Sequence, residues 1–572
     1  MTTELNKTEH APTIAIDLGT TNSLVGVFDQ GDIRLIPNSS GYLFTPSAIA
    51  LDQNQQLLIG QSALELRSRG DEVLSSFKRL MGTTQKLTLN HRQFSAEELS
   101  ALILKSLKAD AEHALGITIT EAVITVPAYF NDIQRQATIS AAQMAGLNVS
   151  RLINEPTAAA LAYGLGQTDD SCFLIFDLGG GTFDVSIVEL FEGVIEVRAS
   201  TGDNFLGGDD FVTAIVNAFW QQYGAQFAQD TSFIPPDVLT ALTAKAQQAM
   251  HQLTANEQTT LVFAWQDQQV SMPISVLAFN EWIEPLLSRL RRPLERALRD
   301  ARLKPSQIDQ IVMVGGATRI PAVRKLVTKL FGRFPSTSIQ PDEAIVRGAC
   351  IQAGLKNKDQ ALKEVVLTDV CPFSLGVAVG SEGYFDPIIE RNTVIPASKV
   401  NHYHSMQEGQ REIVLRIYQG EQRLCQENIF LGELLVRLPP NKEHLSIEVR
   451  FSYNPNGILD VDVHVPSSGE KLQKVLINHQ SVMSAEQIQQ ARQQLEALKI
   501  HPRDTLANKA LILKADRLYR EMTGDLRSHV AQQTQVFTQA LDSQNDHKIR
   551  EARVQFDRFL KDIEEASLFE AD

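Results

Sequence analysis

Cysteine is scarce in this chain of 572 residues. The four that occur, Cys172, Cys350, Cys371 and Cys425, are far apart and form no CxxC pair. Zinc sites and disulfide frameworks need more closely spaced cysteines, so the spacing argues against both. We expect the four thiols to be buried and to act as small apolar side chains.

An excess of basic residues and long apolar runs are also lacking. Lys and Arg number 53 against 68 Asp and Glu, and the formal net charge of -15 would repel the phosphate backbone of nucleic acids. The first ten residues are polar, without the apolar region of a signal peptide, and no segment has the uncharged run of a membrane span. The composition predicts a cytoplasmic protein that has neither nucleic acid nor a membrane as its partner.

The length predicts several domains, because single domains rarely exceed about 300 residues. Apolar strand-like runs alternate with helical stretches as far as Ala353, which is typical of α/β architecture. Alternating apolar residues then predict an antiparallel β domain, with a hairpin at Asn454–Gly457. Ser484 and Gln487 fit a capping box that opens a helical segment, which Pro502 should interrupt.

Two segments, IDLGTTNS from Ile16 and FDLGGGTFD from Phe176, share the sequence Asp-Leu-Gly after an apolar strand. This echo favours a duplicated α/β unit whose halves face each other across a cleft, although coincidence in a tripeptide is the alternative. Glycine lets backbone N–H groups approach phosphate closely, and threonine hydroxyls add donors. The carboxylates Asp17 and Asp177 would then lie near a magnesium ion.

A third glycine turn, VGGATR from Val314, lies between a strand and a helix that we expect to begin near Pro321. Backbone donors at such a helix start suit an anion or a nucleotide sugar. The sequence GxxxxGK(S/T) is absent, so a P-loop is excluded.

These motifs, with FKRLMG, VPAYFND, INEPTAAALAYGL, GDNFLGGDDF, PDEA and VLTDVCPFSLGV, resemble the 70-kilodalton heat-shock (DnaK-type) chaperone family from Thr13 to about Asp562. The segments ARLKPSQID, IIERNT and LTDVCPFSLG are most similar to its bacterial HscC branch. The resemblance implies a multidomain α/β plus β protein: an actin-like, two-lobed, duplicated ATPase domain (residues 12–358), a linker (359–370), an antiparallel β-sandwich peptide-binding domain (371–482) and an α-helical lid (483–572).

The resemblance also implies the ligands and the residues that hold them. ATP or ADP and Mg²⁺ are the expected cofactors, with K⁺ as a further candidate ion, and Asp17 and Asp177 would contact the metal through waters. Lys78 would position the attacking water and Glu155 would order the magnesium waters. The other phosphate and nucleoside contacts would be Thr20, Thr21, Gly179, Gly180, Gly181, Thr182, Gly315, Gly316, Arg319 and Asp342. From the residues alone, we would expect Lys78 to be a solvated side chain and Glu155 to be an acid that stabilises the start of a helix.

Further residues are assigned by the resemblance to coupling and to peptide binding. Pro127, Arg135, Val366, Leu367 and Asp369 would relay the nucleotide state between the domains. Extended apolar client peptides would lie in a pocket formed by Val377, Tyr403, Ile413, Leu415 and Ile447, with Met406 near the arch above it. Alternating apolar residues are more often ordinary sheet core. A J-domain co-chaperone is the expected second partner.

Three departures from the family pattern are visible. Gln247, Met250 and His251 stand where many relatives carry charged residues around the nucleoside, so we expect faster ADP release. The hairpin at residues 259–279 is short, which puts dependence on the usual nucleotide exchange factor in question. Thr368 replaces a leucine of the linker, so we expect weaker linker docking.

The leading interpretation is an ATP-dependent chaperone that hydrolyses ATP to control its grip on extended apolar peptides. A small-molecule kinase of the same fold would explain the cleft but not residues 371–572. A regulatory or exchange-factor-like family member is the third alternative, and the presence of Lys78, Glu155 and Thr182 argues against it.

Overall fold

The computed structural model of the chain describes residues 12–52, 54, 56–67, 71–164, 170–191, 194–228, 230–336, 340–357, 359, 362, 366–440, 444–467, 470–475, 483–496, 503–522, 524–542 and 546–569. Three predictions lie at least partly outside the described residues. They are the first part of the linker, the boundary near residue 482 and the interruption at Pro502.

The first sheet has the strand order β11-β10-β1-β2-β3, with β4 paired to β2. Ile14 and Ile16 of β1 belong to one apolar core and Ala15 to another, so helices cover both faces of this strand. The strands are β1 (Ile14–Asp17), β2 (Asn22–Asp29), β3 (Asp32–Ile36), β4 (Thr45–Pro46), β10 (Glu121–Val126) and β11 (Asn148–Asn154). The associated helices are α2 (Ala96–Leu115), α3 (Asp132–Met144), α4 (Glu155–Gly164) and α9 (Ala344–Lys356).

A smaller region is inserted between β4 and β10 of the first sheet and carries α1 (Gln61–Arg67), β5 (Ala48–Leu51), β6 (Leu57–Ile59), β7 (Val73–Ser75), β8 (Leu87–Leu89) and β9 (Arg92–Phe94). The long helix α2 begins at Ala96 because Ser95 and Glu98 form a complete capping box. It ends at Gly116, whose φ of 70° lies in the left-handed region that favours glycine.

The second sheet has the order β17-β12-β13-β14-β18-β21. β12 pairs antiparallel with β13 and parallel with β17, as β1 does with β2 and β10, so both sheets contain the same three-strand pattern. Its strands are β12 (Ser171–Leu178), β13 (Phe183–Phe191), β14 (Val194–Asp203), β17 (Gln310–Val314), β18 (Val366–Val370) and β21 (Val394–Ile395). Around them lie α5 (Gly208–Tyr223), α6 (Pro236–Gln252), α7 (Val276–Ala301), α8 (Pro321–Phe331) and the hairpin of β15 (Gln258–Trp265) with β16 (Gln268–Ser275).

Two four-stranded antiparallel sheets follow and enclose one apolar core. One consists of β19 (Leu375–Val379), β20 (Tyr384–Ile389), β23 (Glu412–Gln419) and β24 (Ile429–Arg437), and the other of β22 (Ala397–His404), β25 (Ser446–Tyr453), β26 (Leu459–Val465) and β27 (Glu470–Val475). The predicted hairpin is confirmed: β25 and β26 are joined at residues 454–458, where Gly457 has a φ of 72°. We call this unit the sandwich.

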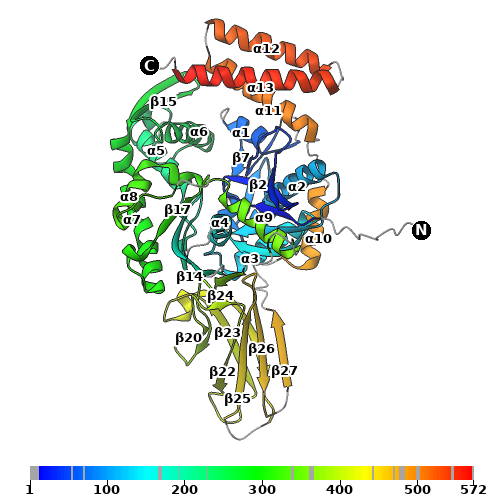
Figure 1. The fold of residues 1–572 in the computed structure, drawn as a ribbon, viewed down its shortest axis with the longest axis vertical. Helices are drawn as coiled ribbons and strands as arrows, with labels where there is room; N and C mark the ends of the chain where they lie inside the picture. Colours follow the sequence, from blue (N-terminus) through cyan, green and yellow to red (C-terminus); the bar gives the residue numbers. More distant parts are fainter. Residues whose placement is uncertain are drawn as a thin grey trace, which may run out of the picture.

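The C-terminal helices are α10 (Ala485–Glu496), α11 (Arg503–Glu521), α12 (Gly524–Asp542) and α13 (Asp546–Phe569). Ser484 and Gln487 form the predicted capping box, with reciprocal hydrogen bonds of 2.7 and 3.2 Å. Helices α12 and α13 lie at the opposite end of the molecule from the sandwich, α11 packs against α1, and α10 packs against α2 and α3 (Figure 1). The C-terminal helices therefore do not cover the sandwich in this conformation.

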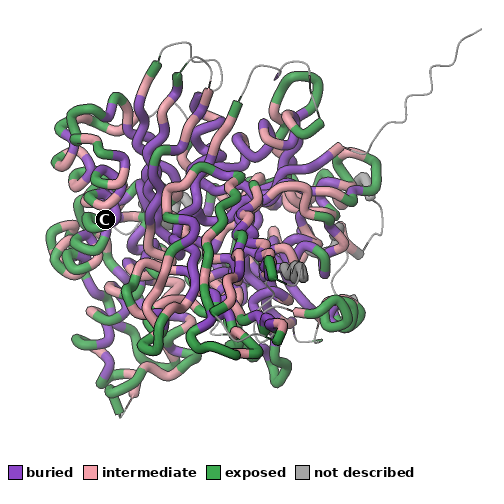
Figure 2. Tube along the Cα trace, turned by 90° about the horizontal axis from the view of Figure 1, so that it is seen from below, coloured by how far each residue is buried: buried purple, intermediate pink, exposed green. Residues whose placement is uncertain are grey.

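The buried segments run through the strands and the exposed segments lie mostly in peripheral helices and loops (Figure 2). All four cysteines are buried, as predicted, and burial raises the pKa of the Cys371 thiol to about 12. Among the described residues, no helix combines the length and the apolar character needed to span a membrane.

Candidate active site

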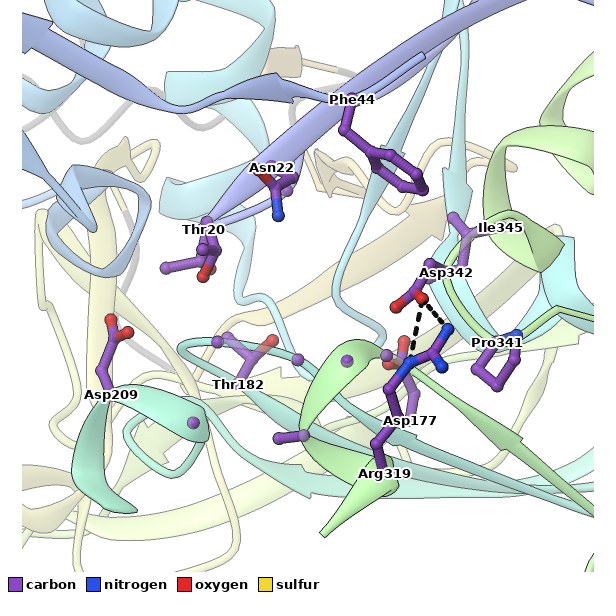
Figure 3. Close-up of a pocket in the computed structure, with 18 of the residues that line it drawn as sticks. Thr20, Asn22, Phe44, Asp177, Thr182, Asp209, Arg319, Pro341, Asp342 and Ile345 are labelled. Atoms are coloured by element: carbon purple, nitrogen blue, oxygen red, sulfur yellow. Dashed lines mark hydrogen bonds and ion pairs between the residues drawn. The ribbon is translucent and has the colours of Figure 1, made fainter. Parts of the chain in front are cut away.

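A cavity of about 400 Å³ is lined by residues from the ends of strands in both sheets. Thr20 extends into it from the β1–β2 turn, Asn22 from the start of β2, and Thr182 from the β12–β13 turn (Figure 3). Every residue predicted to contact phosphate, metal or nucleoside lines this cavity except Gly181: Asp17, Thr20, Thr21, Lys78, Glu155, Asp177, Gly179, Gly180, Thr182, Gly315, Gly316, Arg319 and Asp342.

The glycine turns pack closely against one another. A Cβ atom added to Gly180 would lie 1.8 Å from Thr21 Oγ1, and one added to Gly315 would lie 2.4 Å from the carbonyl oxygen of Leu178. Gly315 also has a φ of 83°, which larger residues rarely adopt. Only glycine lets these backbone segments come so close, which leaves their N–H groups near the cavity.

Buried carboxylates lie in and beside the cavity. Burial raises the pKa of Asp17 to about 7 and that of Asp184 to about 8, and in each case the Glu155 carboxylate adds to the effect. Burial, followed by Glu155, also raises the pKa of Asp177. The Lys78 ammonium lies 2.6 Å from Glu155 Oε1, with both side chains buried, and it partly offsets this negative charge.

The donor set fits a hydrated magnesium ion with a polyphosphate. Asp177 Oδ2 and Thr21 Oγ1 are buried and have no hydrogen-bond partner among the described residues. Burial and the neighbouring carboxylates raise the pKa values of these acids, and a divalent cation with a water shell would supply positive charge that favours their ionised forms. The carboxylates of Asp17 and Asp177 are the groups that would hold it.

At the other end of the cavity, Arg319 forms an ion pair with Asp342, with Nε 3.2 Å from Oδ2. The wall contributed by α6 contains Gln247, Met250 and His251, as the sequence predicts. Phe44 also lines the cavity. No sequence pattern singles out Phe44, because it lies in a loop whose course depends on the rest of the fold.

Arg79, next to Lys78 in the FKRLMG motif, is a second residue that the sequence does not single out. Its guanidinium donates to Gly181 O at 2.9 Å and to Asp210 Oδ2 at 2.6 Å. Arg79 lies in the smaller region between β4 and β10, whereas Gly181 and Asp210 lie in the part of the chain that carries the second sheet. The Arg79 side chain therefore joins the two sides of the cavity.

Arg135 lies in a buried polar network between the first sheet and the sandwich. Its guanidinium donates to Asn154 Oδ1 at 2.7 Å and to Ala128 O at 3.2 Å, and its Nη1 lies 3.5 Å from Asn456 O of the sandwich. Pro127 directly follows β10, and its carbonyl accepts the Phe130 N–H.

The same network continues to the predicted linker. Asn154 Nδ2 and Thr157 Oγ1 donate to Asp369 Oδ2 at 2.9 and 2.8 Å. Asp369 belongs to β18, which pairs in parallel with β14 through Val366 to Thr368 and antiparallel with β21 through Asp369 and Val370. Leu367 packs against the core between the sheets, whereas Val366 is 52% exposed.

The predicted peptide-pocket residues are divided between the core and the surface. Val377, Leu415 and Ile447 are buried in the sandwich core. In this conformation they are therefore ordinary sheet-core residues, which was the alternative to a peptide pocket. Ile413 and Tyr403 are half-buried, Tyr403 donates to Asp386 Oδ2 at 2.7 Å, and Met406 is 66% exposed. The structure does not present these six residues as one open pocket.

The fold and the site define a class: an α/β nucleotide-binding protein whose cavity suits a magnesium-bound polyphosphate and whose second sheet continues into a β-sandwich. The model of the Hsp70 protein family matches residues 13–88 and 84–569, and the chain belongs to the Hsp70 family. It is 39% identical over 536 residues to the chaperone protein DnaK of Thermotoga neapolitana, Thermotoga petrophila and Thermotoga maritima. Each match covers 90% of this chain and 88% of the relative.

Family membership establishes the general function that the sequence predicts. The chain is an ATP-dependent chaperone and an ATP hydrolase, with ATP or ADP and Mg²⁺ as cofactors. Client peptides and a J-domain co-chaperone are its partners. The comparisons do not distinguish the HscC branch, which stays a prediction.

Proposed function

We propose that this chain is an ATP-driven peptide clamp whose nucleotide cavity controls the sandwich through strand β18. One observation carries the proposal: β18 is hydrogen-bonded at one end to β14 of the second sheet and at the other to β21, which leads into the sandwich. A change in the packing around the cavity therefore has a direct backbone connection to the peptide-binding unit.

In the cavity, Thr20, Thr21 and the backbone of residues 179–181 bind the phosphates, and the Arg319–Asp342 end binds the nucleoside. A bound Mg²⁺ neutralises polyphosphate charge and so allows the Asp17 and Asp177 carboxylates to lie nearby.

Lys78 has a fixed position because Glu155 accepts its hydrogen bond and the Phe130 ring lies 5.7 Å from its ammonium. A fixed cation at this place orients the attacking water and stabilises the charge that develops during phosphoryl transfer. Glu155 and Thr182 complete the catalytic set.

The repeated three-strand pattern supports an actin-like duplication with two lobes within residues 12–358. We assign residues 359–370 as the linker, 371–482 as the peptide-binding sandwich and 483–572 as the lid. Among the described residues, α11 packs on α1 and α10 on α2 and α3 of the ATPase domain, and α12 and α13 lie far from the sandwich, so these helices leave the sandwich uncovered. Hydrolysis would release β18 and let the helices return to the sandwich.

A single-turnover ATPase assay, with and without an extended apolar peptide, tests this function. The intact chain should hydrolyse ATP faster when peptide is present. Lys78→Ala should retain nucleotide binding and lose most hydrolysis, because the fixed cation is removed. Lys86→Ala is the matched control, since Lys86 is exposed.

Three results would contradict the proposal: hydrolysis that peptide leaves unchanged, normal hydrolysis by Lys78→Ala, or identical peptide release in ATP and ADP. The first and third would refute the coupling, and the second would refute the assignment of Lys78. Sugar-dependent ADP production without a peptide effect would favour a kinase instead.

Membership of the HscC branch, a cytoplasmic location and independence from the usual exchange factor are parts of the same proposal. The uncharged α6 wall and the short β15–β16 hairpin support the last of these. Adding a family exchange factor should leave the ADP release rate unchanged, and an acceleration would refute that part alone.

A further inference from the structure

Phe44 separates two cavities. It lines the nucleotide cavity, and it also lines a second cavity of about 290 Å³ beneath the C-terminal helices. The second cavity is bounded by Pro46 and Gln61 on one side and by Leu511 and Val554 of α11 and α13 on the other. Figure 3 shows the Phe44 ring projecting into the nucleotide cavity from the side opposite Arg319 and Thr182.

The loop that carries Phe44 is bonded to the phosphate-binding turn. Thr45 pairs with Ser23 through the short strand β4, and the Ser47 N–H donates to Thr21 O at 2.8 Å. The Asn38 side chain donates to Phe44 O at 3.0 Å and fixes the loop from its other end. A shift of this loop therefore changes both the Phe44 ring and the backbone beside the phosphates.

Helix α13 holds the same loop from outside. The Tyr42 hydroxyl donates to Asp557 Oδ1 at 3.0 Å, and the Lys561 ammonium lies 4.7 Å from the centre of the Tyr42 ring. Lys561 also pairs with Asp557 at 2.8 Å. Tyr42 is two residues from Phe44, so the position of α13 determines the position of the Phe44 loop.

The helices are anchored beside this contact by a buried interface. Leu513 of α11 packs into an apolar cluster with residues of β5, β6 and α1, and Arg517 Nε lies 3.0 Å from Glu65 Oε2. Lys245 of α6 pairs with Glu521 at 2.6 Å, so the C-terminal helices contact both sides of the nucleotide cavity.

The wall of the cavity that α6 contributes offers little charge to a nucleotide. Gln247 and Met250 are uncharged, and burial lowers the pKa of His251, so its imidazole is neutral at pH 7. Retention of the nucleoside therefore depends more on apolar contact, for which an aromatic ring is well suited.

We propose that Phe44 is a nucleotide-contact residue that packs on the nucleoside, and that the docked C-terminal helices hold it there through Tyr42. Docking of the helices then slows nucleotide release by a route that does not pass through β18. This inference rests on the proposed position of the nucleoside at the Arg319–Asp342 end.

Stopped-flow dissociation of a fluorescent ADP from the full chain tests the contact. Phe44→Ala should release ADP about tenfold faster, because an apolar aromatic contact is lost. Phe44→Tyr should release it at nearly the wild-type rate, since the ring is kept. Phe334→Ala, which removes an 86% exposed ring, is the matched control and should have no effect.

A second series tests the dependence on the helices and follows release of a fluorescent non-hydrolysable ATP analogue, because the proposed cycle has the helices docked on the ATPase domain before hydrolysis. Tyr42→Phe keeps the ring and removes the hydrogen bond to Asp557, and it should accelerate release. Leu513→Ser should undock the helices and also accelerate release, and adding Tyr42→Phe to it should change nothing further. Val536→Ala on the exposed surface of α12 is the control, and hydrogen exchange of α1 reports docking independently.

Unchanged ADP release from Phe44→Ala, with a normal melting temperature, would overturn the contact. Faster release from Phe44→Ala but not from Leu513→Ser would overturn the dependence on the helices. Additive effects of Tyr42→Phe and Leu513→Ser would overturn the route through Tyr42. Failure of the proposed function is distinguishable, because it would appear as missing peptide stimulation in a chain whose nucleotide release still responds to these variants.

Discussion

Replacing Asp369 by alanine should detach β18 from the second sheet. The Asp369 carboxylate is buried and accepts hydrogen bonds from Asn154 Nδ2 and Thr157 Oγ1. Both donors are themselves buried while β18 is docked, and both would reach water once it undocks. The substitution therefore acts on the equilibrium between the docked and undocked strand.

The magnitude follows from the two donors left without an acceptor. Each such buried group costs about 1 to 3 kcal/mol, so the docked state loses at least about 2 kcal/mol. A loss of this size lowers the docking equilibrium constant about thirtyfold. Asp369→Asn keeps one acceptor oxygen in the same shape and should have a smaller effect.

Hydrogen exchange measured by mass spectrometry reports the result, because amide protons of β14 and β18 are protected while these strands are paired. With ATP present, Asp369→Ala should exchange much faster in both strands than the wild-type chain. Glu390→Ala, which removes an exposed acid of the sandwich, is the control and should exchange normally. Unchanged protection of β18 in Asp369→Ala would refute the reasoning.

Three further predictions concern pH, the C-terminal helices and nucleotide release. Burial raises the pKa of Asp132, which accepts the Leu459 N–H of the sandwich, from its ordinary value of 3.8 to about 7. Docking of the sandwich should therefore be strongest below that lower value and weaken as the pH rises to about 7, and Asp132→Asn should abolish the dependence in a fluorescence docking assay. Lys245→Ala should change docking of the C-terminal helices by less than about 1 kcal/mol, as judged by hydrogen exchange of α1, because its ion pair is partly exposed. Met250→Lys should slow ADP dissociation in stopped flow by up to about fivefold, since it adds a cation beside an anionic ligand, and acceleration would contradict the importance of the uncharged wall.

The parts of the fold that depend on local chemistry could be predicted from the sequence. The turn at Asn454–Gly457 needs a residue with positive φ, and Gly457 provides it. The helix after Ser484 begins where a side chain can satisfy its free N–H groups. The glycines of the phosphate-binding turns are informative for the same reason, because their backbone geometry excludes other residues.

The contacts between distant segments could not be predicted. Tyr42 and Asp557 are separated by 515 positions, and Glu65 and Arg517 by 452, so no spacing or periodicity relates them. The positions of Phe44 and Arg79 depend on how the two sheets are placed and not on their neighbours in sequence. Accessibility of the peptide-pocket residues is likewise a property of one conformation, and an alternating pattern does not specify it.

Strand β18 also protects a sheet edge. While it is paired, the backbone of Val194 to Glu196 in β14 has hydrogen-bond partners on both sides. Departure of β18 leaves a short row of unpaired amide and carbonyl groups there, and such rows can recruit strands from other chains. Pairing of β18 with β14 therefore also protects the protein against self-association. Each release of β18 exposes the edge of β14 until β18 pairs with it again.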